Sequence, residues 1–460
     1  MERREFLKAL AALGGALAVR PMNSFGAVSP TVVPDARRSK LPASAGLFLA
    51  FTDLHNHSLI SGDALGDPNS ALLDIKAGGI DVACMTEHAI SGKDHGQLTC
   101  PGWEKGGCHT VEGINGEDWK AMRTIANAAY DPGNFVSFRA FEYSTPTVGH
   151  INVWFSEQFT DALHEFAFVT PKAISEADQL IPQLQPIVDP FEQAPDIATI
   201  VPFYDWLSSP PDRALLGGGN DGIACFNHPG DYGDFEAWSF HPAAAGRLRM
   251  FEAFNTGGYN NPDFFWFGAD KGMPNPFNAC LNAGWRVGFT GVSDEHSGVY
   301  RSHTGIGRGG LWLSSLERDP VRAALLARRG FATLEDNLRL DATTNGHPMG
   351  SALAHGSGPV TIELDIDNGP AWVGKSLVVE VVGPGSNAPT LIAAVPVVVP
   401  SPDQPPITFV VNVNQADTKW LFLRIIDPAR AKHPLGKAPF EQYGGAAAYA
   451  SPWFFDPPVA

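Results

Sequence analysis

The sequence predicts an α/β protein in which a β/α barrel of seven strands is followed by a small C-terminal β-sandwich. Short apolar runs alternate with helical segments from residue 50 to about 335, which is typical of β/α units. Potential metal ligands recur where these apolar runs end, and that is where a β/α barrel keeps its chemistry. After residue 340 apolar and polar residues alternate with a period of two, as in antiparallel sheets.

The elements of the predicted barrel occupy residues 46–335. Its strands are expected at 46–53, 80–86, 135–143, 151–155, 223–227, 248–255 and 286–293. Residues 70–77, 117–130, 197–207 and 276–283 have helical character, and a further helix opens at Asp319-Pro320 and runs to residue 329. The stretch 156–222 is longer than a simple connection needs, so we expect an insertion near the site mouth, where loops set substrate choice.

The predicted β-sandwich occupies residues 340–460. Strands are expected at 360–366, 377–382, 391–399, 407–413 and 420–426, separated by Pro, Gly, Asn and Asp clusters. This region has few His or Cys residues and no visible ligand set. We therefore expect it to be structural, or to form a wall of the site.

Length, composition and net charge limit the classes of protein to which this chain can belong. The chain has 460 residues, of which 44% are hydrophobic and 18% charged, so it can bury a large core in two domains. Its formal net charge is −17. Such a surface repels polyphosphate backbones, so we expect no nucleic-acid partner.

The first 27 residues resemble a twin-arginine export signal. Arg3-Arg4 precedes Phe6, Leu7 and an apolar Ala/Leu/Gly run that reaches Val19. An ordinary basic amphipathic terminus is the alternative. The resemblance implies that the twin-arginine export machinery is a partner and that the protein is periplasmic or secreted. No other segment reaches the 18 or more apolar residues of a spanning helix, so we expect no membrane span in the mature form.

The five cysteines form no ligand motif. Cys100 and Cys108 bracket a Gly-containing loop, and the sequence leaves open whether they form a disulfide or stay reduced. Cys84, Cys225 and Cys280 lie in apolar surroundings and are predicted to be small core residues.

Nine potential metal ligands follow one another along the chain. They are His55, His57, Asp63, His88, Glu142, His150, His228, Asp294 and His296. A single His beside a strand end is usually a hydrogen-bonded polar residue, but the order and placement of nine together favour a metal site. Six imidazoles and three carboxylates suit two or three divalent transition metals (Zn, Mn or Fe) better than Mg or Ca.

Spacing explains how these residues could meet. His55 and His57 flank one residue of an extended segment, so both imidazoles point to the same face. A barrel gathers its strand ends into one ring, which brings distant residues into one coordination sphere. His150 is the weakest member of the set, because it precedes its predicted strand instead of ending it.

The ligand-bearing stretches resemble the PHP metallohydrolases, named for polymerase and histidinol phosphatase. The matching stretches are Asp53-Leu-His55-Asn-His57, Thr-Glu87-His88, Glu142, His150, His228-Pro and Ser293-Asp294-Glu-His296. The resemblance implies a distorted seven-stranded barrel, two or three Zn, Mn or Fe ions, and the nine residues above as their ligands. The Phe251-Glu-Ala-Phe-Asn segment and the β-rich tail are similar to the branch that contains carbaryl hydrolases.

Two departures from the family pattern matter. The family usually has Thr-Asp-His where this chain has Thr-Glu87-His88, and its Ser-Asp-Gly is rearranged here to Ser61-Gly-Asp63. We therefore expect Glu87 to orient an imidazole instead of binding a metal.

The ligand set predicts hydrolysis by a metal-bridging hydroxide, which attacks a phosphoryl or acyl centre. Asp294 or His296 is the expected proton shuttle, and His228 could hold a metal that polarises the electrophilic oxygen. Arg301, His303 and Arg308 are the expected contacts of a substrate anion. The alternative is that the two arginines pair with carboxylates of this acidic protein.

Three functions remain open. The first is a metal-dependent phosphoesterase that acts on a small-molecule substrate. The second is a metal-dependent hydrolase of carbamates, esters or amides, which an aromatic pocket built from Trp154, Trp206 or Trp266 would favour. The third is a non-catalytic exported protein that binds metal or carbohydrate.

Overall fold

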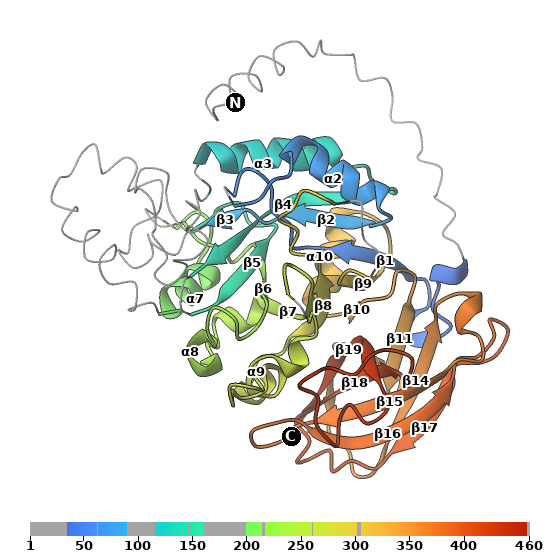
Figure 1. Ribbon diagram of the computed structural model, residues 1–460. Coiled ribbons are helices and arrows are strands. Elements are labelled where there is room, and N and C mark those ends of the chain that lie inside the picture. The colour runs from blue at the N-terminus through green and yellow to red at the C-terminus, as the bar shows by residue number, and fades with distance from the viewer. Residues whose placement is uncertain are drawn as a thin grey trace. The chain divides into compact units, whose positions relative to one another are not determined.

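A mixed sheet of fifteen strands organises the part of the chain that the computed structural model describes, as Figure 1 shows. The described residues are 35–61, 63–89, 114, 116–145, 148–160, 199–213, 217–259, 261–300 and 305–457. They belong to one compact unit, Val33–Ala460. The predicted export signal, Cys100, Cys108, Arg301 and His303 lie outside them, as does most of the predicted insertion.

The strands predicted for the first region are all present. They are β1 (Phe48–Asp53), β2 (Val82–Met85), β4 (Val136–Ser144), β5 (His150–Trp154), β6 (Ile223–Phe226), β7 (Leu248–Asn255) and β8 (Gly288–Val292), with the short β3 (His88–Ala89) beside β4. They neighbour one another in chain order. Each pair is parallel except those that involve β5, which runs antiparallel to β4 and to β6.

The chain segments that follow β1 and β8, the first and last strands of this series, hydrogen-bond to each other. The Asp294 amide donates to the His55 carbonyl over 2.9 Å, and the His57 amide donates to the Glu295 carbonyl over 3.0 Å. Gly291 of β8 permits close approach to the neighbouring β9 (Arg308–Leu313), because a Cβ there would lie 2.6 Å from the Arg308 carbonyl oxygen. The segments that follow β1 and β8 are therefore side by side.

Helices cover this part of the sheet where the sequence predicted them. They are α2 (Pro68–Ala77), α3 (Gly116–Ala129), α7 (Val201–Ser208), α9 (Pro276–Ala283) and α10 (Arg318–Ala327). Local sequence explains the limits of α9, because the Asn275 side chain accepts from the Asn278 amide and Gly284 ends the helix at a φ of 111°. In Figure 1, α2 and α3 lie side by side over β2 and β4. Within the described ranges, no helix has both the length and the apolar character needed to cross a membrane.

The element α8 (Phe235–Trp238) is a left-handed turn. Its four residues have φ values of 51°, 54°, 55° and 61°, and Asp234 caps it by accepting from the Ala237 amide. Left-handed backbone costs a residue with a side chain about 1–2 kcal/mol, so consecutive residues of this kind are rare. The buried Phe235 holds the turn in place, since its amide donates to the Val148 carbonyl over 2.9 Å.

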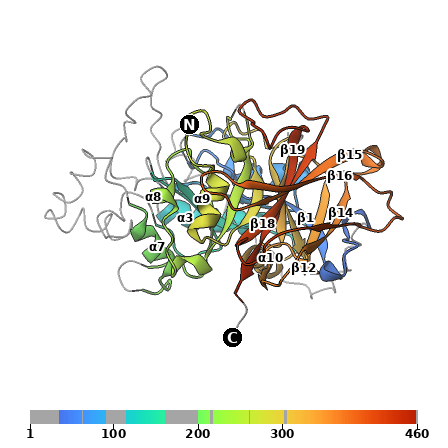
Figure 2. The same cartoon turned by 90° about the horizontal axis from the view of Figure 1, so that it is seen from below.

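The C-terminal strands continue the large sheet. Its remaining members are β9, β10 (Gly330–Thr333), β13 (Ala352–Ala354), β15 (Ser376–Gly383), β16 (Thr390–Val398), β18 (Trp420–Asp427) and β19 (Gly445–Asp456). A separate antiparallel sheet contains β11 (Arg339–Thr344), β12 (His347–Pro348), β14 (Val360–Asp367) and β17 (Ile407–Val411). Figure 2 shows β14, β15 and β16 on one side of the molecule and α7, α8 and α9 on the other. The division into two domains at about residue 340 stays a prediction.

Hydrophobic contacts join the C-terminal strands both to one another and to the first region. One core cluster contains Ile362 of the four-stranded sheet and Leu421 of the large sheet. Another contains Phe277 and Phe289 of the first region together with Phe422, whose ring lies 5.1 Å from that of Phe289. The cysteines Cys84, Cys225 and Cys280 are buried and free, as predicted.

Candidate metal centre

The nine predicted ligands gather at one edge of the sheet. Strand direction explains this, because the carboxyl ends of β1, β2, β4, β6, β7 and β8 all point to that edge. His150 belongs there too, since β5 runs antiparallel to its neighbours and therefore begins where they end. His150 is the first residue of β5. This position made it the weakest member of the set in the sequence, and it is the reason that His150 lies near the other ligands.

Three groups of side chains could each hold a metal ion. They are His57, His88 and His296; His55, His57 and Asp294; and Glu142, His150 and His228, each with ligand atoms within 4.8 Å of one another. Asp63 extends the first group, since its Oδ2 lies 3.1 Å from His88 Nε2 and 3.6 Å from His296 Nε2. The groups are adjacent because His57 belongs to two of them.

The imidazoles of His55 and His57 face each other through their Nε2 atoms, which are 3.0 Å apart. His55 Nδ1 donates to Glu252 Oε1 over 2.8 Å. His57 Nδ1 lies 2.9 Å from Ser61 Oγ, which gives its own proton to Glu87 Oε2 and must therefore accept from the imidazole. In the neutral form of each ring, Nε2 carries a lone pair that can bind a metal ion. The lone pairs of two neutral rings at this distance repel unless a proton or a metal ion lies between them.

Asp294 aims one carboxylate oxygen at the same point. Its Oδ1 lies 3.1 Å from His55 Nε2 and 3.3 Å from His57 Nε2, yet it is buried without a hydrogen-bond partner. Asp294 also has a φ of 51°, and strained backbone of this kind clusters at functional sites. The fit to a metal ion is good, because a buried carboxylate oxygen without a partner is costly otherwise.

Glu142 lies between the groups. Its Oε1 is 3.2 Å from His150 Nδ1, 3.3 Å from His228 Nε2 and 3.3 Å from His55 Nε2. Its Oε2 is 2.7 Å from His88 Nδ1. Burial raises the pKa of Glu142, but His150, His55 and His88 outweigh burial and hold that pKa well below its usual range. A carboxylate that faces all three groups could bridge two ions.

His57 is a neutral imidazole at physiological pH. Burial, together with the facing His88 and His296, lowers the pKa of His57 to about 3. Neutral imidazole is the form that binds divalent transition metals. His57 is therefore in the form that binds such ions.

Glu87 supports the loop that carries His57, as expected, and does so through Ser61. Its carboxylate accepts from the amides of Ser58 and Ser61 over 3.0 and 3.1 Å and from the Ser61 hydroxyl over 2.7 Å. The Ser61 hydroxyl in turn accepts from His57 Nδ1 and from the His88 amide. Glu87 thus orients one imidazole and one backbone segment of the centre.

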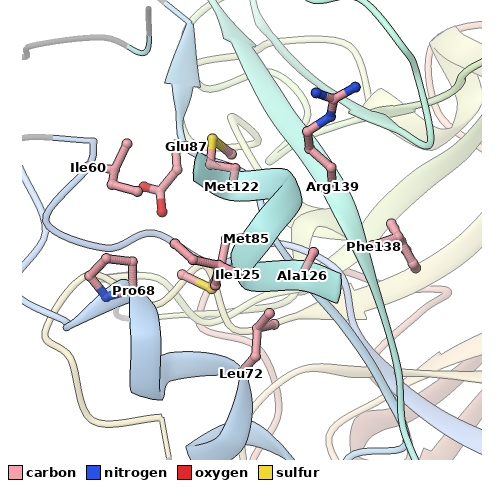
Figure 3. Close-up of a pocket in the computed structure, with 10 residues that line it drawn as sticks. All are labelled: Ile60, Pro68, Leu72, Met85, Glu87, Met122, Ile125, Ala126, Phe138 and Arg139. Carbon is pink, nitrogen blue, oxygen red and sulfur yellow. The ribbon is translucent and has the colours of Figure 1, made fainter. Parts of the chain in front are cut away.

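A small, mainly apolar pocket lies next to this loop. Ile60, Leu72, Met85 and Glu87 are among its lining residues, which Figure 3 shows between α2, α3 and the strands. It contains none of the tryptophans considered for an aromatic substrate pocket. Those tryptophans belong to the packed interior instead: Trp154 Nε1 donates to the Leu54 carbonyl, Trp206 packs against Phe141, and Trp266 Nε1 donates to Glu441.

Glu252 and Asn255 are parts of the centre to which the sequence assigned no role. Besides His55, Glu252 accepts from the His228 amide over 2.7 Å and from Asn255 Nδ2 over 3.0 Å. Asn255 Nδ2 also lies 3.1 Å from Asp294 Oδ2. The available signal was an acidic residue inside the otherwise apolar run Met250–Phe254, where burial demands a partner.

Two tyrosines stand beside the Glu142, His150 and His228 group. Tyr232 is 43% exposed, and its ring stacks on that of His150 at 4.2 Å and 10°. Tyr259 Oη donates to Asp231 Oδ2 over 2.7 Å. Burial, with Asp231 and Glu142 adding to it, raises the pKa of Tyr232, so its hydroxyl stays protonated at neutral pH.

Among the expected contacts of a substrate anion, the structure describes Arg308. This residue is buried at the start of β9, and its Nη2 lies 2.8 Å from Asp336 Oδ1. Pairing with a carboxylate is what the alternative expected. A role in binding substrate stays a prediction for Arg308, as it does for Arg301 and His303.

Comparison with known proteins leaves the family of this chain open. No family model matches it, and neither does any curated protein. Among solved structures it is similar to a two-domain protein from Bacteroides vulgatus ATCC 8482 that contains a predicted PHP-like metal-dependent phosphoesterase. The TM-score is 0.38 and the identity 13%, over 89% of this chain and 97% of that one. A likeness this weak assigns neither a family nor a function to this chain.

Proposed function

We propose that the protein is a metal-dependent hydrolase and that its substrates are small phosphoesters. The observation that carries the proposal is the convergence of His55 Nε2, His57 Nε2 and Asp294 Oδ1 on one point. We further propose that the nine ligands hold two or three ions of Zn, Mn or Fe. Glu142 would be shared between neighbouring ions, because its two oxygens face different groups.

The proposed architecture is a distorted PHP-like barrel made by β1, β2 and β4 to β8, followed by a sandwich of the C-terminal strands. The hydrogen bonds between the segments after β1 and β8 support closure of the barrel. The shared apolar cluster of Ile362 and Leu421 supports the sandwich. We also propose, from the likeness of residues 251–255, that the protein is related to the branch that contains carbaryl hydrolases.

Divalent metals bound here would lower the pKa of a coordinated water and polarise a phosphoryl oxygen. The chain itself supplies orientation and proton transfer. His296 is the proposed proton carrier, because its side chain is 34% accessible, more than the 23% of Asp63, the other partly exposed ligand. Asp294 would hold its ring, whose Nδ1 lies 3.0 Å from the Asp294 carbonyl oxygen. His228, fixed through its amide by Glu252, would orient the electrophile.

Once each of the three adjacent groups holds a metal ion, they would offer positive charge to several oxygens of one phosphoryl group. A phosphoester therefore fits the centre. Arg301, His303 and Arg308 remain the proposed contacts of its anionic part, on the basis of sequence. A second candidate is the hydrolysis of aryl carbamates or esters. The exposed ring of Tyr232 favours it, since that ring offers an aromatic surface beside His150.

The test is an assay of metal-loaded protein against p-nitrophenyl phosphate, bis(p-nitrophenyl) phosphate, p-nitrophenyl acetate and an aryl carbamate. We expect phosphoester turnover that His55→Ala abolishes, whereas His347→Ala, a change at an exposed histidine of β12, should leave turnover intact. Faster turnover of the carbamate would replace the first function by the second. Loading with metal but no turnover of any substrate would favour a non-catalytic metal-binding protein.

We also propose export by the twin-arginine machinery to the periplasm or the medium, on the Arg3-Arg4 pair. The machinery reads paired guanidinium groups, so exchanging both residues for Lys should retain the protein inside the cell. Cell fractionation measures this, and an unchanged exported yield would refute the proposal.

A further inference from the structure

A fully buried ionic cluster joins the C-terminal strands to the segment that follows β7. Arg424 of β18 is its centre: Nη1 lies 2.9 Å from Glu380 Oε2, Nη2 contacts Glu441, and Nε donates to Tyr449 Oη over 2.9 Å. Burial lowers the pKa of Arg424, but Tyr449 and the three nearby carboxylates outweigh burial and raise it. The guanidinium therefore remains charged in the interior.

Asp263 connects this cluster to the first region. Tyr449 Oη donates to Asp263 Oδ1 over 2.7 Å, and Arg424 Nη2 lies 3.5 Å from Asp263 Oδ2. Phe265 of the turn η5 (Phe264–Trp266) shares the contact, since its ring lies 4.8 Å from the Arg424 guanidinium carbon. Strands β18 and β19 thus fix the start of η5.

The same segment returns to the end of β7 beside the metal centre. Asp263 forms an isolated antiparallel bridge with Phe254, and the Asn255 amide donates to the Pro262 carbonyl over 3.0 Å. Asn255 Nδ2 lies 3.1 Å from Asp294 Oδ2, opposite the oxygen that faces His55 and His57. A continuous path of bonds therefore leads from Tyr449 through Asp263 and Asn255 to a proposed metal ligand.

Stability alone does not account for such a cluster. Burying an ion pair costs several kcal/mol per ion, and well-packed apolar residues in its place are often neutral or stabilising. What a buried ionic cluster offers instead is geometry, because each hydrogen bond fixes a direction. Here the directions set the position of the segment that holds Asn255.

From this path we infer that Asp263 and Tyr449 are positioning residues of the metal centre, so that the C-terminal strands form part of the site. The inference rests on the proposed metal-dependent function. Loss of the Tyr449 hydroxyl should release Asp263, let Asn255 shift, and leave Asp294 less well oriented. Partners behind a metal ligand typically contribute about 10- to 100-fold in metal affinity.

The experiment measures Mn²⁺ dissociation constants of the full chain by calorimetry. Tyr449→Phe keeps the ring and removes the hydroxyl, and Asp263→Asn is the second variant should the first fail to fold. The matched control is Thr343→Val, which removes one partly buried side-chain hydrogen bond, to Glu363, in the four-stranded sheet. Circular dichroism and thermal unfolding confirm that each variant is folded and compare the stability losses.

We expect the dissociation constant to rise about tenfold in Tyr449→Phe and to stay within about twofold in Thr343→Val. We also expect Tyr449→Phe to add little to Asn255→Ala in the double variant, because both act on the same path. An unchanged constant in both Tyr449→Phe and Asp263→Asn would overturn the inference, as would full additivity with Asn255→Ala. If the wild type binds no Mn²⁺, Zn²⁺ or Fe²⁺ at all, the proposed function itself fails.

Discussion

At the residue scale, the candidate centre is built from polar side chains that are almost all buried. His55, His57 and Glu142 are 0%, 0% and 1% exposed, and Asp294 Oδ1 has no hydrogen bond. Leaving a polar group in this state costs about 1–3 kcal/mol, and an unpaired charge costs more. Among the nine ligands, Asp63 and Asp294 each have a buried carboxylate oxygen in this state. Divalent cations would complete these oxygens with the correct charge.

Gly257 shows how closely the surrounding chain fits Asp294. A Cβ at position 257 would lie 2.6 Å from both the Cβ and the carbonyl oxygen of Asp294. Gly257→Ala should therefore displace Asp294 and weaken Mn²⁺ binding by about tenfold or more. Gly246→Ala is the control, because a Cβ there meets no atom within 4 Å. Calorimetric titration of both variants measures the effect, and equal affinities would show that Asp294 does not depend on this contact.

At the scale of elements, the sequence predicted the strands that lead to the centre and missed several that do not. The strands β1, β4 and β8 were found because apolar runs end in polar ligands there. The strand β19 was missed because Gly445–Asp456 begins with an Ala-rich run, shows no alternation, and is buried on both faces. The strand β9 begins Arg308-Gly-Gly, a poor strand sequence that close packing requires, because a Cβ at Gly309 would meet Thr52 and Thr290, and one at Gly310 would meet the Phe331 ring.

The sequence predicted the candidate ligands but not the residues that hold those ligands in place. Ligand types and their order are properties of the sequence, so nine candidates could be named, and the structure brings their side chains together. The contacts of Glu252 with His55 and of Asn255 with Asp294 depend on how β7 lies beside β1 and β8, which no local pattern encodes. The sequence also did not identify Asp336 as the carboxylate partner of Arg308, because the two side chains meet only in the fold.

The left-handed turn α8 allows a direct test of an element. Ala237 is exposed and has φ 55° and ψ 38°, a conformation in which its Cβ is unfavourable. Ala237→Gly should stabilise the protein by about 1 kcal/mol, because Gly adopts this conformation without the side-chain penalty. Urea unfolding measures the change.

The control for this prediction is Ala323→Gly in the right-handed helix α10. Ala323 is also exposed, and there Gly should destabilise by about 1 kcal/mol. Opposite signs for the two substitutions support the left-handed turn. Destabilisation of similar size by both would mean that residues 235–238 form an ordinary helical turn.

At the scale of the whole molecule, the sheet does not stop where the composition changes near residue 340. The strand β10 pairs with β19, so the C-terminal strands hydrogen-bond to the strands of the first region. The cluster around Arg424 then reaches the segment beside Asn255. A β-rich region that looks structural in sequence is thus physically connected to the candidate centre.

The central claim is that nine converging side chains form a metal centre, and the most direct test is the metal content of the purified protein. After reconstitution and gel filtration, elemental analysis should find at least two equivalents of Zn, Mn or Fe per chain, because three groups could each hold an ion. His57→Ala should lose the most, since His57 belongs to two groups, whereas His347→Ala should keep the wild-type content. Less than one equivalent in the wild type, or an unchanged content in His57→Ala, would contradict the assignment.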